Sequence, residues 1–154
     1  MSVFPGASAF PGNFATAALG VFWDIQQCEI PDGQTAAEVV ERLRSNFRES
    51  GHLGPVSINA YGDMTPHDFA SSGIKHNHFP AGDKYGRQTK MLEDIVAWAG
   101  ENPEPSTLLL IAGDVPDELV EAVKLLKSRK NYHLLYVHPA PRPTVITLFP
   151  LPED

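Results

Sequence analysis

The sequence has 154 residues, of which 42% are hydrophobic and 20% are charged, and its formal net charge is −7. This balance is typical of one folded domain, it excludes wholesale disorder, and the negative charge argues against binding nucleic acid by bulk charge alone. The single cysteine, Cys28, excludes an internal disulfide, and apolar runs such as residues 108–112 are far shorter than the roughly 20 residues of a membrane span.

The first residues carry no recognisable targeting signal. They contain glycine and proline but no positive charge, so they lack the basic start of a secretory signal and the arginines of a transit peptide. We expect a flexible tail over residues 1–16 and a single domain over residues 17–150. With neither a signal peptide nor a membrane span, the expected location is intracellular, either cytoplasmic or organellar.

Apolar runs and helical periodicities alternate along the chain. Residues 19–23 predict a buried strand that ends at Asp24. Thr35 and Glu38 form a capping-box pair that begins a helix extending to Phe47. The elements predicted after this helix are strands at 56–61 and 74–79, a helix at 86–99, a strand at 108–112, a helix at 117–129, and strands at 132–137 and 144–149.

Such alternation is typical of a parallel sheet with helices on both faces. We expect an α/β fold with a mostly parallel, five- to six-stranded sheet in the order 3-2-1-4-5. Ligands bind to such sheets beyond the carboxyl ends of the strands, where the strand order reverses. Asp24 follows the first strand and Asp114 follows the fourth, so this order places both acids at one crevice. Paired carboxylates suit Mg²⁺, which prefers oxygen ligands and can activate a water molecule.

Each acid also has a purely structural interpretation. Asp114 precedes the helix that starts at Asp117 and could cap it, and Asp24 could cap a loop turn. Other motifs are weaker, because neither a dinucleotide-binding glycine pattern nor a P-loop is present. His76 and His78 would share one face of a strand, but no third ligand with zinc spacing accompanies them.

The motifs together resemble a known family. Residues 21–28 (VFWDIQQC), followed by Ile-Pro at 30–31 and Gly33, are similar to the opening of NYN domains of the limkain-b1 (meiosis arrest female protein 1) type. That opening normally contains W-D-I-E-N-C. Further matches occur at residues 60–63 (AYGD) and 110–114 (LIAGD), and the similarity runs in order from about residue 18 to residue 138. Plant proteins of this group have the same Tyr-Gly-Asp form, which suggests a plant origin.

The resemblance implies a PIN-like three-layer sandwich and metal-dependent endoribonuclease activity in RNA metabolism. Asp24 and Asp114 match the family's catalytic acids, which would bind Mg²⁺ or Mn²⁺. Other acidic positions of the family are changed, and each exchange for glutamine removes a negative charge from the metal site. The family's glutamate and asparagine after the first acid are Gln26 and Gln27, its helix aspartate is Gln88, and its last acid falls on Pro116, with Asp117 one place late. Gln27, Gln88 and Asp117 are therefore candidates for additional site residues.

Two functions compete for a site with so few acids. One is a weak endoribonuclease that regulates gene expression through RNA. The other is a catalytically inactive NYN domain that binds RNA, a protein partner or a second copy of itself. For single-stranded RNA we expect contacts along Lys84, Arg87 and Lys90, because Arg87 and Lys90 share a helix face and the amino end of a helix favours phosphate.

Overall fold

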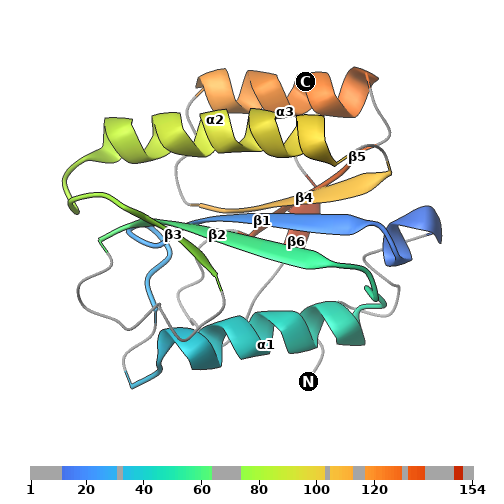
Figure 1. The fold of residues 1–154 in the computed structure, drawn as a ribbon, viewed down its shortest axis with the longest axis horizontal. Coiled ribbons are helices and arrows are strands. Elements are labelled where there is room, and N and C mark those ends of the chain that lie inside the picture. The colour runs from blue at the N-terminus through green and yellow to red at the C-terminus, as the bar shows by residue number, and fades with distance from the viewer. Residues whose placement is uncertain are drawn as a thin grey trace.

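The computed structural model describes residues 12–30, 33–63, 74–102, 105–112, 117–129, 132–137 and 148–150. Four strands of the sheet pair in parallel from its β3 edge inward: β3 (Lys75–His78), β2 (Val56–Gly62), β1 (Ala18–Asp24) and β4 (Ser106–Ile111). β5 (Tyr132–Val137) extends the sheet in parallel beside β4, and β6 (Leu148–Pro150) pairs antiparallel with β5. The order is β3-β2-β1-β4-β5-β6 (Figure 1). The predicted mostly parallel sheet and its strand order are therefore confirmed.

Helices cover both faces of this sheet, which gives the expected three layers. α1 (Ala36–Glu49) lies on one face, and α2 (Lys84–Glu101) and α3 (Asp117–Arg129) lie side by side on the other (Figure 1). None of these helices in the described part of the chain is both long enough and apolar enough to cross a membrane.

The helix starts follow from their caps. At α1, Glu38 N donates to Thr35 Oγ1 at 3.1 Å and Thr35 N donates to Glu38 Oε1 at 3.0 Å, which confirms the predicted capping box. At α2, the Asp83 side chain accepts a hydrogen bond from Gly86 N at 2.9 Å, so the helix begins two residues before the predicted start at residue 86. The predicted strand at 144–149 is observed only from Leu148, because residues 144–147 lie outside the described ranges.

A short 3₁₀ helix, η1 (Gly12–Ala15), precedes β1. Its Phe14 packs against the core beneath α1, and Leu53 N donates to Ala15 O at 2.6 Å. The tail predicted over residues 1–16 thus overlaps a segment that is bonded to the loop before β2, while residues 1–11 lie outside the described residues.

β1 is the central strand, and its side chains supply both halves of the core. Leu19, Val21 and Trp23 pack toward α1, whereas Phe22 packs toward α2. On the α2 side, the rings of Phe22 and Trp98 meet edge to face with centroids 6.1 Å apart. This burial on both faces holds the last residue of β1, Asp24, in a fixed position at the carboxyl edge of the sheet.

The close approach of α2 to β1 depends on Gly20. A Cβ atom at Gly20 would lie 2.5 Å from Trp98 Cε2, and the buried indole has little room to move away. We therefore expect Gly20→Ala to lower the free energy of unfolding by about 1–3 kcal/mol, measured by urea denaturation. Gly100→Ala is the control, because a Cβ there would meet no atom within 4 Å and alanine favours a helix. Equal stability of the two variants would show that this contact does not constrain the fold.

Candidate functional site

Asp24 is buried at the end of β1, with 1% of its surface exposed. Its Oδ1 accepts hydrogen bonds from the backbone amides of Gln26 at 3.0 Å and Gln27 at 3.3 Å. The carboxylate therefore caps the turn that follows the strand, as one of the two interpretations of the sequence had it. These hydrogen bonds fix the direction of the carboxylate independently of any ligand.

Arg87, on the first turns of α2, donates its Nε–H to the same Oδ1 at 2.9 Å. The side chains of Arg87 and Asp24 are 4% and 1% exposed, so this is a buried ion pair. Arg87 Nη1 also lies 3.4 Å from Ala81 O, in the turn before the helix. Because a guanidinium stays charged at all ordinary pH values, Arg87 neutralises the Asp24 carboxylate permanently while the pair is intact.

Arg87, which we expected to contact RNA together with Lys84 and Lys90, is buried. Its side chain turns toward Asp24 at the carboxyl edge of the sheet. Lys84 is exposed, and Lys90 is 42% exposed and forms an ion pair with Asp94 at 3.1 Å. A signal in the sequence indicated the burial: Arg87 extends the buried stripe of α2 that continues through Met91, Ile95 and Trp98.

The loops around Asp24 are tied to one another. Gln26 Oε1 accepts a hydrogen bond from Asp63 N at 2.7 Å, which joins the loop after β1 to the end of β2. Gly62 permits this approach, because its φ is +145° and a Cβ there would meet Ile25 Cγ1 at 2.6 Å. Gln26 therefore serves as a structural link at a position where the family has a glutamate.

The other predicted site residues are brought together only in part. β1 pairs in parallel with β4, with Trp23 opposite Ile111, so the two strands end at one edge as expected. Asp114 itself lies outside the described residues. Gln27 and Gln88 are half-buried, the first bonded through its amide to Asp24 and the second next to Arg87 in α2. Asp117 is exposed at the start of α3.

Among the residues that the structure describes, the donor atoms around Asp24 do not fit a divalent cation. Within the described ranges, no group of three His, Cys, Asp or Glu side chains is placed to hold a metal ion. The Oδ1 of Asp24 already accepts three hydrogen bonds, and the neighbouring Gln26 and Gln27 carry no charge. A cation bound to Asp24 would lie close to the buried Arg87 guanidinium, whose positive charge would repel it.

Two nearby groups that ionise in many active sites are held neutral here. Burial, and then the charge of Asp24, raise the pKa of Cys28 to about 12, so its thiolate is scarce at neutral pH. Burial, and then the hydrogen bond from Tyr61 OH to Asp94 Oδ2 at 2.8 Å, raise the pKa of Tyr61 above its usual value. Asp94 is thus engaged by both Tyr61 and Lys90.

The chain is similar in sequence to known proteins. The model of the NYN domain family matches residues 18–147. The chain is 27% identical over 124 residues to meiosis regulator and mRNA stability factor 1 from Mus musculus and from Bos taurus, and 26% identical to that from Xenopus tropicalis. Each alignment covers 78% of this chain and 7% of the relative, so the chain spans a small part of these proteins. The three relatives are animal proteins, and the plant origin stays a prediction.

We expect Arg87→Met to lower the free energy of unfolding by about 3–5 kcal/mol, because it leaves the Asp24 carboxylate buried without its partner. Adding Asp24→Asn to this variant should restore much of the loss, since both charges are then removed. The control is Arg48→Met, which breaks an exposed ion pair with Glu41 and should cost at most about 1 kcal/mol. Urea denaturation of the four proteins gives the comparison, and a loss at Arg87 no larger than at Arg48 would contradict the assigned role of the buried pair.

Proposed function

We propose that this chain, which belongs to the NYN domain family, binds single-stranded RNA in the regulation of mRNA and cleaves that RNA poorly or not at all. The observation that supports this proposal is the buried ion pair between Arg87 and Asp24. It engages the carboxylate that the family resemblance identifies as a catalytic metal ligand.

The suppression of cleavage follows from charge. A nuclease metal needs negatively charged oxygen ligands that offset its two positive charges. Here the first-strand acid is already paired with a cation 2.9 Å away, and the positions that would add negative charge are occupied by Gln26 and Gln88. A divalent ion approaching Asp24 would therefore meet the repulsion of the Arg87 guanidinium instead of a cluster of carboxylates.

Support for RNA as the ligand comes from the relatives and from the edge of the sheet. The relatives are named mRNA stability factors, and we extend to this chain the RNA association that the name carries. Lys84 is exposed at the start of α2, and Lys90 lies one to two turns further along the helix. The first-turn amides of α2 add partial positive charge to the same edge. Because the chain carries a net charge of −7, the binding should be weak and strongly dependent on salt.

A second candidate is a residual Mg²⁺- or Mn²⁺-dependent endoribonuclease. The observation in its favour is that β1 and β4 are adjacent and parallel, so the chain that leads to Asp114 leaves the same edge at which Asp24 lies. This function requires a divalent ion at Asp24 despite the neighbouring Arg87 guanidinium, which distinguishes it from the first candidate.

The RNA surface can be tested by fluorescence anisotropy with labelled single-stranded RNA at two salt concentrations. We expect Lys84→Gln and Lys90→Gln each to weaken binding and to lower the salt slope by about one unit, because each removes one phosphate contact. Lys124→Gln, which removes the same charge from α3, should leave both quantities unchanged. Absence of RNA binding by the unmodified protein at low salt would refute the proposed function.

The same RNA, incubated with Mg²⁺ or Mn²⁺, tests the second candidate. The unmodified protein should yield no more product than the Asp24→Asn/Arg87→Met variant, which removes both members of the pair. Efficient cleavage that this variant abolishes would favour the endoribonuclease and show that the ion pair does not suppress cleavage.

A further inference from the structure

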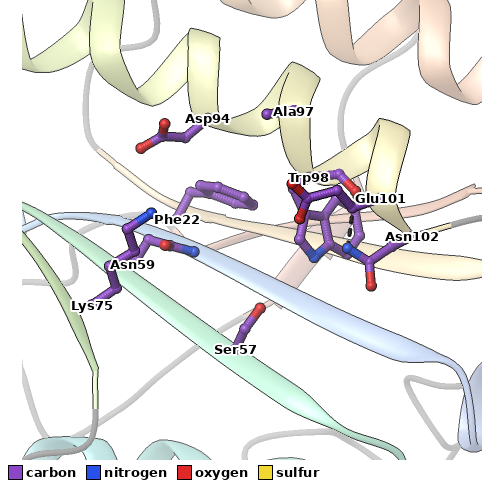
Figure 2. A pocket seen from close by; sticks show the side chains of 9 residues that line it. All are labelled: Phe22, Ser57, Asn59, Lys75, Asp94, Ala97, Trp98, Glu101 and Asn102. Atoms are coloured by element: carbon purple, nitrogen blue, oxygen red, sulfur yellow. Dashed lines mark hydrogen bonds between the residues drawn. The ribbon is translucent and has the colours of Figure 1, made fainter.

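A hollow of about 310 Å³ lies between α2 and the β2 side of the sheet (Figure 2). We call it the α2–β2 pocket. Its sheet residues are Phe22 of β1, Ser57 and Asn59 of β2, and Lys75 at the start of β3, which pairs in register with Asn59. Ser57 and Lys75 are exposed, so α2 leaves this part of the sheet uncovered. The pocket is therefore separate from the carboxyl edge that holds Asp24.

The pocket combines an apolar floor with converging polar groups. Phe22 and Trp98 form the floor, as Figure 2 shows. Asp94 and Glu101 reach the pocket from α2, and Asn59 and Lys75 lie across from them on the sheet. This mixture of hydrogen-bond acceptors and donors around an apolar surface is suited to a flat ligand with a polar edge.

Two of these polar groups are held in place by the fold. Asp94 is oriented by Tyr61 OH at 2.8 Å and by Lys90 Nζ at 3.1 Å. Asn59 Nδ2 lies 3.4 Å from Val21 O, and its Oδ1 has no hydrogen bond to any residue that the structure describes. The pocket therefore presents acceptor groups whose positions are set before a ligand arrives, which lowers the entropy cost of binding.

We propose that the α2–β2 pocket receives one unpaired nucleobase with an exocyclic amine, from the single-stranded RNA of the proposed function on which this inference rests. Bases of single-stranded RNA turn out of the strand and are recognised by contacts to their edges. Carboxylate and amide oxygens accept hydrogen bonds from the exocyclic amines of adenine and cytosine. Uracil carries a carbonyl oxygen in place of that amine, and this oxygen would face the carboxylates unfavourably.

The positive charges around the pocket fit an RNA strand that extends from the carboxyl edge of the sheet to the pocket. Lys84 and Lys90 lie along α2, and Lys75 lies on β3 at the border of the pocket. Lys90 also contacts Asp94, so a cation stands directly beside the pocket wall. Phosphates placed along these lysines would lead from the carboxyl edge of the sheet to the pocket, although the protein as a whole is acidic.

The test measures the anisotropy of labelled A₁₀, C₁₀ and U₁₀ RNA with the unmodified protein. We expect A₁₀ or C₁₀ to bind about fivefold or more tightly than U₁₀, a preference that one well-placed base contact provides. Ala97→Phe, at an exposed pocket position, should fill the hollow and abolish the preference. Glu101→Ala should also reduce it, because this substitution removes an acceptor.

Glu93→Ala is the matched control, because Glu93 is an exposed glutamate of the same helix that does not line the pocket. Both glutamate variants lose one negative charge, so any general gain in RNA affinity cancels in the ratio between the RNAs. Equal affinities for the three RNAs, or a preference that survives Ala97→Phe and Glu101→Ala, would overturn the pocket assignment and leave RNA binding intact. Failure of all three RNAs to bind would refute the proposed function as well.

Discussion

The ion pair between Arg87 and Asp24 connects the parts of the molecule that form the candidate site. Asp24 ends the central strand β1, and Arg87 lies on the first turns of α2, so the 2.9 Å contact joins the sheet to the helix layer above it. The turn after β1 and the turn before α2 both bond to the pair, through the amides of Gln26 and Gln27 and through Ala81 O. The arrangement of this edge therefore depends on two opposite charges that satisfy each other out of water.

The ion pair changes the charge at the carboxyl edge of the sheet. A cluster of unpaired carboxylates repels RNA phosphates unless a metal ion offsets its charge. Here Asp24 is paired with Arg87, and Gln26, Gln27 and Gln88 are neutral, so these positions add no net negative charge to the edge. Phosphates can approach the lysines of α2 without a bound metal. In the proposed function, poor cleavage and RNA binding thus have one electrostatic cause.

The fold was largely predictable, because its signals are local or periodic. The apolar run of β1, the capping box at Thr35 and the stripe of α2 each determined an element without knowledge of its partners. The burial of Arg87 was missed because the face it shares with Lys90 was interpreted as an RNA surface, although its spacing from Met91 placed it on the buried stripe. The α2–β2 pocket had no sequence signal, since it exists only where α2 leaves β2 uncovered.

The central claim is that Arg87 excludes a divalent cation from Asp24. The most direct measurement is a Mn²⁺ titration of protein labelled with ¹³C at the aspartate carboxyl carbons, because a bound paramagnetic ion broadens the signals of its ligands. Comparison with the Asp24→Asn spectrum identifies the Asp24 signal. The account predicts that this signal stays sharp at Mn²⁺ concentrations that broaden the exposed Asp83. Selective broadening of the Asp24 signal at the lowest Mn²⁺ concentrations would contradict it.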